Sequence, residues 1–281
     1  MNNLELNKIY CESNLETMSR MPDGFIDLTV TSPPYDNLRT YKDDIDKSWG
    51  EHVWKPIIKE LYRVTKKGGV VVWVVNDATI NGSETGTSFR QALYAIECGF
   101  NLHDTMIYKR VSPFSDSVRF HQSFEYMFIW SKGKPNTFNE LREPKTEKTI
   151  QRKNTKLTER QKDGSMRNAN EKAEQRLKKG IEIKDKLMSN IWSIPAGFMV
   201  STTDEISFNH PAIFPEKLVS QHIHSWSNEG DLVYDPFMGS GTTAKMAHIY
   251  KRNWIGSEMS QEYVDLANKR LKPYLDQQTL F

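Results

Sequence analysis

Apolar residues occur along this chain in two patterns, short runs and longer stretches with helical spacing. The short apolar and β-branched run at 25–31 predicts a buried strand. The continuous apolar run at 70–75 predicts a strand that is covered on both faces, because a strand points its side chains alternately to its two sides. Apolar residues three or four positions apart over 53–64 predict a helix that ends in the basic and glycine-rich segment 66–69. Further strands are expected at 7–11, 101–109, 124–131, 231–234 and 253–257, and further helices at 15–21, 88–98, 215–226, 242–250 and 261–271. Strands that alternate with helices indicate an α/β fold, with a mostly parallel sheet and helices on both faces.

The composition is that of a globular protein with a sizeable core, since 37% of the 281 residues are hydrophobic and 26% are charged. No apolar run approaches the roughly 20 residues that span a bilayer. The first residues lack the basic start and the apolar core of a secretion signal. The two cysteines, Cys11 and Cys98, both stand in apolar surroundings. We therefore expect buried, reduced thiols, a cytoplasmic location and no contact with a membrane.

Positive charge is concentrated in one part of the chain. Between Arg142 and Lys186 there are 15 Lys and Arg against 8 Asp and Glu, although the whole chain has a formal net charge of only +2. This window contains few large apolar residues, so it cannot bury a core of its own. A run of charges is commonly only a solvated face. The alternative is an electrostatic surface that binds a polyanion.

A stiff bracket, Ser32-Pro33-Pro34-Tyr35, follows the strand at 25–31. Proline has no N–H for the sheet and fixes its own φ, and it holds the preceding residue extended. Ligands of open α/β sheets bind at the carboxyl ends of the strands, so Ser32 and Tyr35 are candidate site residues. The polar stretch 36–49 is expected to form a mobile lid beside them.

A second candidate segment, Asp235 to Thr243, joins an expected strand to an expected helix. Gly239 and Gly241 remove Cβ atoms where a ligand has to lie against the backbone, and the start of the helix adds N–H donors. Glu258 ends the next strand 17 residues after Gly241. A carboxylate there can accept hydrogen bonds from both hydroxyls of a ribose. The spacing indicates a nucleoside-containing cofactor, whereas the missing third glycine argues against a nicotinamide dinucleotide.

Together, the segments 31–35 and 235–243 resemble the two signatures of S-adenosylmethionine-dependent DNA amino-methyltransferases. The order, with the catalytic signature first and the cofactor signature near the C-terminus, resembles the β group of that family. His210-Pro211-Ala212 with Phe214-Pro215 is similar to a further cofactor motif of the family. One departure is Ser13, where members of the family often carry an aspartate. The resemblance covers residues 7–131 and 190–272.

The resemblance implies a Rossmann-like sheet with an inserted basic target-recognition region. Residues 1–131 would form the catalytic part of the methyltransferase domain, 132–189 the insertion, and 190–281 the cofactor-binding part. The implied cofactor is S-adenosylmethionine and the implied partner is double-stranded DNA, with a homodimer and a cognate restriction enzyme as further compatible partners. The implied catalytic residues are Ser32, Pro33, Pro34 and Tyr35, and the implied cofactor-binding residues are Asp235, Phe237, Gly239, Ser240, Gly241, Thr242, Glu258, His210 and Phe214. No metal is expected.

The implied reaction transfers a methyl group to the exocyclic amine of a flipped base. The Ser32 side chain and the Pro33 carbonyl would accept the two amine hydrogens, and Tyr35 would stack on the base. The leading serine resembles the N4-cytosine members, and N6 of adenine is the alternative. A non-catalytic DNA-binding protein of the same fold, and methylation of RNA or protein, are the other hypotheses.

Three further expectations concern single positions. The strand at 7–11 should lie beside the sheet next to the C-terminal helix, because that helix needs a following strand and the chain has ended. Glu125, between aromatic residues of an expected strand, is interpreted as a structural buried acid. His222, on an apolar helix face, is interpreted as a structural histidine rather than a metal ligand.

Overall fold

The computed structural model describes residues 4–35, 49–110, 120, 122–145, 158–168, 185–195, 197 and 199–276. They belong to two units, Met1–Asn139 with Asn190–Phe281, and Glu140–Ser189. The expected lid at 36–49 lies outside the described residues except for Trp49.

An eight-stranded sheet forms the centre of the first unit. Its order is β1 (Lys8–Cys11), β14 (Asn253–Glu258), β13 (Leu232–Asp235), β2 (Ile26–Thr31), β3 (Thr65–Val75), β7 (Phe124–Ser131), β6 (Asn101–Lys109) and β12 (Ile191–Ser193). Neighbouring strands are parallel except for β7, which runs antiparallel to both β3 and β6. The sheet is therefore mostly parallel, as the sequence predicts.

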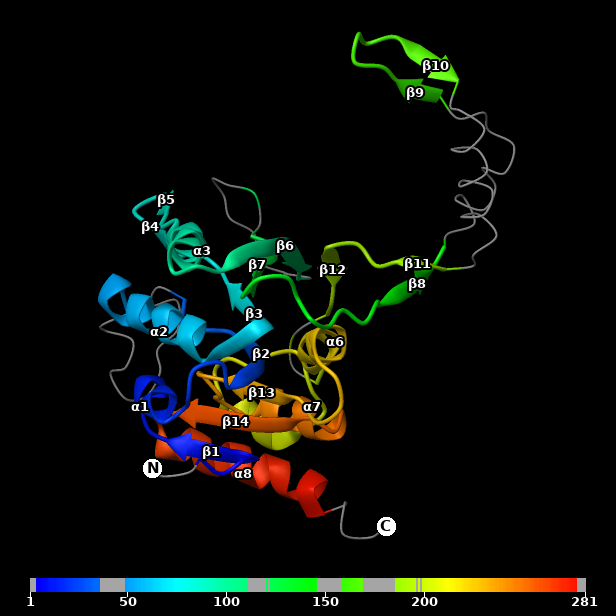
Figure 1. Ribbon diagram of the computed structural model, residues 1–281. Helices are drawn as coiled ribbons and strands as arrows, with labels where there is room; N and C mark the ends of the chain where they lie inside the picture. Colours follow the sequence, from blue (N-terminus) through cyan, green and yellow to red (C-terminus); the bar gives the residue numbers. More distant parts are fainter. Residues whose placement is uncertain are drawn as a thin grey trace. The chain divides into compact units, whose positions relative to one another are not determined.

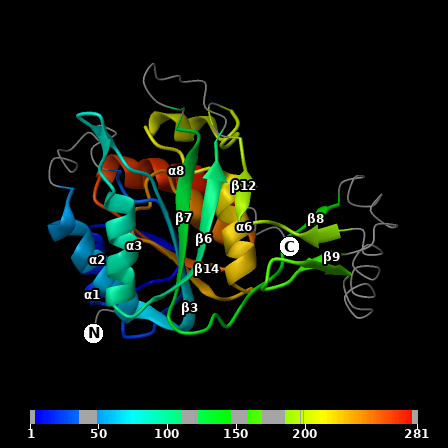
Figure 2. The ribbon, with the colours of Figure 1, turned by 90° about the horizontal axis from the view of Figure 1, so that it is seen from above.

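Helices cover both faces of this sheet (Figure 2). One layer consists of α1 (Asn14–Ser19), α2 (Glu51–Val64) and α3 (Thr87–Glu97), and the other of α6 (Glu216–Trp226), α7 (Thr242–Ile249) and α8 (Gln261–Asp276). The 3₁₀ helix η3 (Glu205–Asn209) contacts α8, and β4 (Thr79–Ile80) pairs with β5 (Ser83–Glu84) in a short hairpin. The expected Rossmann-like architecture is confirmed.

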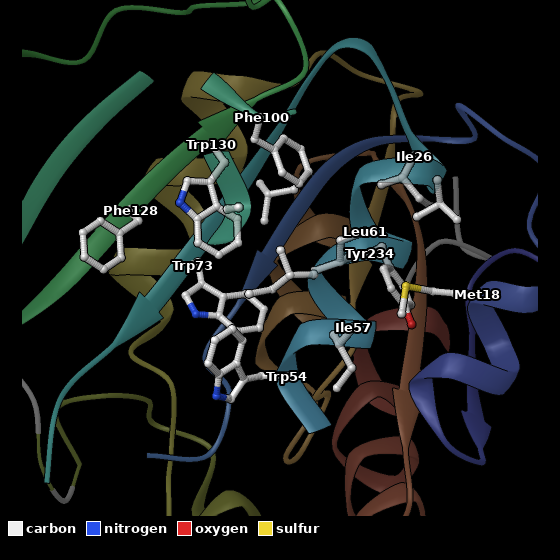
Figure 3. Close-up of a cluster of buried hydrophobic side chains, with 14 of the residues drawn as sticks. Met18, Ile26, Trp54, Ile57, Leu61, Trp73, Phe100, Phe128, Trp130 and Tyr234 are labelled. Carbon is white, nitrogen blue, oxygen red and sulfur yellow. The ribbon is translucent and has the colours of Figure 1, made fainter. Parts of the chain in front are cut away.

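A cluster of buried hydrophobic side chains lies between α2 and the sheet (Figure 3). Trp54 and Leu61 of α2 are buried against the sheet side chains Trp73 and Trp130. The rings of Trp73 and Trp130 stack with centroids 5.2 Å apart. Burying such large aromatic surfaces fixes α2 against β3, and this helix flanks the strand that leads into the Ser-Pro-Pro-Tyr bracket.

The N-terminal strand completes the sheet beside the C-terminal elements (Figure 1). β1 pairs in parallel with β14, with Lys8 opposite Ile255, and α8 contacts both strands. The expectation for residues 7–11 is confirmed: this strand lies in the sheet, and α8 packs against it.

The end of the helix predicted over 53–64 differs from the expectation. The helix predicted to end at 66–69 ends at Val64, and β3 begins at Thr65, whose backbone is extended and whose hydroxyl donates to the Leu61 carbonyl at 2.6 Å. The basic and glycine residues therefore lie in the strand, where Lys66 pairs with Asp27 at 2.7 Å.

The thiols are also less buried than expected. Cys11 is exposed because it lies on the edge strand β1, and Cys98 is half-buried at the end of α3.

In the second unit, the structure describes two short antiparallel pairs. β8 (Arg142–Pro144) pairs with β11 (Asp185–Leu187), and β9 (Thr158–Arg160) pairs with β10 (Met166–Asn168). Residues 132–139, which the sequence assigns to the insertion, lie in the first unit, where the Asn139 side chain donates to the His224 carbonyl at 2.9 Å. None of the described helices has the length and apolar character needed to cross a membrane.

Candidate active site

A cavity of about 490 Å³ lies where β1, β2, β13 and β14 end. Sites for small molecules are typically roughly 300–1,000 Å³ in volume. Pro33 and Gly239 both line this cavity, so the two candidate segments lie together as the sequence predicts. The predicted site residues that line it are Ser32, Pro33, Pro34, Tyr35, His210, Phe214, Asp235, Phe237, Gly239, Ser240, Thr242 and Glu258. Gly241 does not.

Gly241 lies against α8. Its φ of +81° is in the left-handed region, and an added Cβ would lie 3.0 Å from the Ala267 Cβ of α8. The glycine allows the loop to approach α8 closely. This close approach explains why the position needs glycine, and a contact of Gly241 with the cofactor stays a prediction.

Gly239 lies against two side chains that the sequence predicts to bind the cofactor, Glu258 and His210. Its N–H donates to Glu258 Oε2 at 2.8 Å. Its φ is +50°, and an added Cβ would lie 3.0 Å from His210 Nε2. The His210 ring in turn packs on Tyr263 with centroids 4.4 Å apart. A side chain at position 239 would thus displace the His210 motif, and for this reason the position requires glycine.

Asp235 braces the loop instead of pointing freely into the cavity. It accepts from the Thr31 hydroxyl at 2.6 Å, the Thr243 hydroxyl at 2.7 Å and the Phe237 N–H at 3.0 Å. Burial raises the pKa of Asp235 to about 6, although these three hydrogen bonds oppose the shift. Asp235 therefore ties the loop between β13 and α7, residues 236–241, to the end of β2. We call this segment the cofactor loop. We did not single out Thr31 and Thr243 from the sequence, although both lie inside the two signatures.

Arg270 of α8 also supports this loop, through hydrogen bonds. Its side chain is fully buried, and its Nη1 donates to the Ser240 carbonyl at 3.0 Å and to the Thr242 hydroxyl at 2.9 Å. The guanidinium also pairs with Asp204 at 2.7 Å and Glu216 at 2.6 Å. Sequence reasoning missed this residue, because nothing in its local pattern distinguishes it from other basic residues of an amphipathic helix.

Aromatic rings border the cofactor side of the cavity. Phe237 makes edge-to-face contacts with Trp49, at 5.7 Å between centroids, and with Trp73 at 6.1 Å. Trp49 and Phe214 also line the cavity. Rings at these positions offer flat apolar surfaces of the kind that a purine packs against.

The residues present fit an adenosyl-bearing cofactor. Glu258 accepts one hydrogen bond at each oxygen, from Gly239 N–H and from Ser260 N–H at 3.0 Å. A carboxylate has about four acceptor positions, so two remain for ribose hydroxyls. Burial raises the pKa of Glu258, and the backbone N–H groups of Ser260, Gly239 and Met259 oppose that shift. At the departure noted in the sequence, Ser13 lines the cavity and caps α1 by accepting from the Glu16 N–H at 3.3 Å.

The bracket after β2 forms the other side of the cavity. The Ser32 hydroxyl lies 2.8 Å from the Tyr35 hydroxyl, which donates to Glu125 Oε2 at 2.9 Å. Glu125 also pairs with Arg110 at 3.1 Å, and both line the cavity. The structural interpretation of Glu125 is therefore incomplete, because the acid accepts a hydrogen bond from Tyr35, a predicted catalytic residue. The only available signal in the sequence was a charged residue within a strand of aromatic residues.

Tyr108 lies opposite Glu125 in the β6–β7 ladder and also lines the cavity. It is 2% exposed, and its hydroxyl has no hydrogen-bond partner among the described residues. Burial, followed by the charge of Glu125, raises the pKa of this phenol. A buried hydroxyl without a partner is costly, so its place in the cavity wall is consistent with a ligand that supplies the partner.

His222 lies in the core, away from this cavity. Its Nε2 is 3.3 Å from Met127 Sδ, and its ring packs on Trp192 with centroids 4.6 Å apart. Burial lowers its pKa to about 3. No three His, Cys, Asp or Glu side chains gather as a metal site in the part of the chain that the structure describes.

The Rossmann-like sheet, with a glycine-rich cofactor loop and a Ser-Pro-Pro-Tyr bracket in one cavity, defines a methyltransferase. Residues 26–269 match the N6/N4 methyltransferase family, which is described as DNA methylase. The chain belongs to this family of DNA methylases.

Several known proteins are similar to it. Orphan methyltransferase M.BamHII of Bacillus amyloliquefaciens is 55% identical over 254 residues, which cover 90% of this chain and 91% of that protein. Type II methyltransferase M.BglII of Bacillus subtilis is 27% identical over 281 residues, which cover 98% of this chain and 72% of that protein.

Solved structures share the fold. PvuII DNA methyltransferase, which is named as cytosine-N4-specific, has a TM-score of 0.68 at 20% identity over 95% of this chain and 89% of that chain. M1.HpyAVI, solved as a SAM complex, has a TM-score of 0.59 at 20% identity over 94% of this chain and 98% of that chain.

Proposed function

We propose that this protein is a site-specific DNA methyltransferase that transfers a methyl group from S-adenosylmethionine to the exocyclic amine of a flipped base, N4 of cytosine. One observation carries the proposal: the Ser32–Pro33 bracket and the Gly239 loop line one cavity, at the ends of the neighbouring parallel strands β2 and β13. A shared cavity holds the methyl donor and the amine in one place, and this proximity removes much of the entropic barrier to their reaction.

The bracket supplies what the amine requires. The lone pair of an exocyclic base amine is delocalised into the ring, which makes the nitrogen a weak nucleophile. The Ser32 hydroxyl and the Pro33 carbonyl oxygen accept its two hydrogens and draw the nitrogen toward a tetrahedral shape, which is the shape of the transition state. S-adenosylmethionine supplies a methyl group on a positively charged sulfur, so a strong general base is not needed. Tyr35 stacks on the flipped base.

Cytosine is the proposed base because serine leads the bracket, as in the N4-cytosine members that the sequence resembles. Both bases present an amine with two hydrogens, so the bracket chemistry also suits N6 of adenine, which is the second outcome of the test below. Phe237 and Glu258 are proposed to hold the adenine and the ribose of the cofactor, respectively.

The basic window is proposed to bind the phosphates of double-stranded DNA. In the second unit, Arg160, Lys162 and Arg167 on the β9–β10 hairpin are exposed. Exposed cations are accessible to phosphates, which position a protein on the duplex. The homodimer and the cognate restriction enzyme stay predictions.

The test is to express the chain in a host that lacks DNA methylation and to sequence the DNA by a single-molecule method that reports modified bases. Digestion of the same DNA to nucleosides, followed by mass spectrometry, identifies the product. We expect N4-methylcytosine at one short sequence. N6-methyladenine alone would reassign the base, and DNA binding without transfer from labelled cofactor would support a non-catalytic binder instead.

A further inference from the structure

A line of hydrogen bonds leads from Ser32 to the strand wall of the cavity. Ser32 Oγ lies 2.8 Å from the Tyr35 hydroxyl, which donates to Glu125 Oε2 at 2.9 Å. The other carboxylate oxygen, Oε1, lies 3.1 Å from Arg110 Nη1. The expected amine acceptor is thus connected to an ion pair located where β6 ends and β7 begins.

The carboxylate sets the direction of every bond in this line. An ionised carboxylate accepts hydrogen bonds and does not donate them, so the Tyr35 proton points to Glu125. The Tyr35 oxygen is then left to accept, and the Ser32 proton points to Tyr35. Ser32 consequently presents lone pairs, and no proton, to the rest of the cavity.

We infer that Glu125 is a positioning residue that acts through Tyr35 to make Ser32 an acceptor for the target amine. The inference rests on the proposed function. A serine hydroxyl that is free to rotate donates or accepts equally well, and a donating hydroxyl would point its proton at an amine hydrogen. A serine fixed as acceptor also disfavours a carbonyl oxygen at that position, because two acceptors would face each other. Glu125 thereby selects a base that carries an amine over one that carries a carbonyl.

Two substitutions interrupt the line at different bonds. Tyr35→Phe keeps the ring and the ion pair between Glu125 and Arg110 but removes the hydroxyl. Glu125→Gln keeps the size of the side chain, but Arg110 holds the amide oxygen, so the amide NH₂ donates to Tyr35 and the line reverses. Ser32 then receives the Tyr35 proton and turns its own proton into the cavity. Glu97→Gln, at an exposed position of α3, is the matched control.

The experiment uses two duplexes that contain the methylated site, mapped beforehand with the wild-type protein. One carries the target base, and in the other uracil replaces cytosine, or hypoxanthine replaces adenine if that is the mapped base. Dissociation constants are measured with S-adenosylhomocysteine bound, so that no turnover occurs. The base mismatch contributes equally for every variant, and changes in the ratio of the two constants therefore report on the pocket.

The wild-type protein and Glu97→Gln should prefer the amine-bearing duplex. Tyr35→Phe should reduce this preference about five- to tenfold, which corresponds to one hydrogen bond, and Glu125→Gln should reduce it at least as much. The double variant should match Tyr35→Phe, since Glu125 has no route to Ser32 once the hydroxyl is gone. The rate of a single turnover should fall about tenfold or more in each variant, with the cofactor dissociation constant unchanged.

An unchanged preference in both variants, alongside wild-type methylation of the same site, overturns the role of Glu125 and leaves the proposed function standing. A wild-type protein that binds the cofactor poorly and methylates no DNA overturns the proposed function itself. Circular dichroism reports whether Glu125→Gln folds, and if it does not, Tyr35→Phe decides the question alone.

Discussion

Arg270 joins the C-terminal helix to the cofactor loop from a fully buried position, and we expect its loss to affect both stability and cofactor binding. Its guanidinium lies 2.7 Å from Asp204 and 2.6 Å from Glu216, and it donates to the Ser240 carbonyl and the Thr242 hydroxyl. Arg270→Met preserves most of the apolar stem and removes all of these donors at once.

The expected cost follows from the two carboxylates that remain. Removing one member of a buried ion pair costs about 3–5 kcal/mol, because the other charge is left without compensation. Here Lys245 still lies 2.7 Å from both Asp204 and Glu216. We therefore expect the lower end, about 3 kcal/mol of unfolding free energy. The loop loses two hydrogen bonds, so cofactor affinity should fall about tenfold.

The assay is urea unfolding followed by circular dichroism, together with calorimetric titration of S-adenosylmethionine. Arg90→Met is the control, because Arg90 is half-exposed and lies 3.8 Å from Glu51, and an exposed pair of this kind contributes about 0–1 kcal/mol. Equal stability of the two variants would refute the reasoning about Arg270. If Arg270→Met does not fold, Arg270→Lys keeps a positive charge, and its cofactor affinity should still fall because lysine lacks the guanidinium geometry.

Three further outcomes are expected. Ser32→Ala should reduce the methyl-transfer rate about 10²-fold with cofactor affinity retained, whereas Asp235→Ala should lose cofactor binding in the same titration; equal losses of both properties in both variants would contradict the division of roles. Burial raises the pKa of Asp235 to about 6, so the folded form retains a proton that the unfolded form releases. Stability should therefore fall as the pH rises from about 4 to about 6, and urea unfolding of Asp235→Asn should lack this slope. Burial alone would raise the pKa of Asp204, but hydrogen bonds from Arg270, Lys245 and Tyr274 outweigh it and lower this pKa to about 2. Its contribution, about 1–2 kcal/mol after allowance for solvent screening, should be present above about pH 4 and lost toward pH 2, and Asp204→Asn should flatten this acid limb.

Local patterns were sufficient for the strands of the central sheet other than β12, and for the location of the cavity. The short apolar and β-branched run before Ser32 predicts β2, and proline chemistry predicts where it ends. The glycine spacing after Asp235 predicts a strand, a loop and a helix, which are found as β13, the loop and α7. These features depend only on residues close in sequence, so they can be predicted from local patterns.

The residues that the sequence did not reveal depend on packing between distant elements. Glu125 reaches Tyr35 because β7 runs antiparallel between β3 and β6, and a strand pattern does not specify its neighbours. Arg270 reaches the loop because α8 packs beneath it, 30 residues beyond Ser240. Gly241 also depends on a distant element, because its close contact is with Ala267 of α8. In the sequence, a glycine needed for such packing cannot be distinguished from a glycine that makes room for a ligand.

The adjacency of β2 and β13 explains how two signatures some 200 residues apart form one site. Their parallel pairing places both carboxyl ends at one edge of the sheet, and the Thr31 hydroxyl reaches Asp235 across it at 2.6 Å. This bond requires neighbouring strands and does not depend on which strand comes first in the chain. β1 pairs with β14 in the same sheet, although nearly the whole sequence separates these two strands. The order of the two signatures can therefore be permuted without a change in the cavity, provided that these strand pairings are kept.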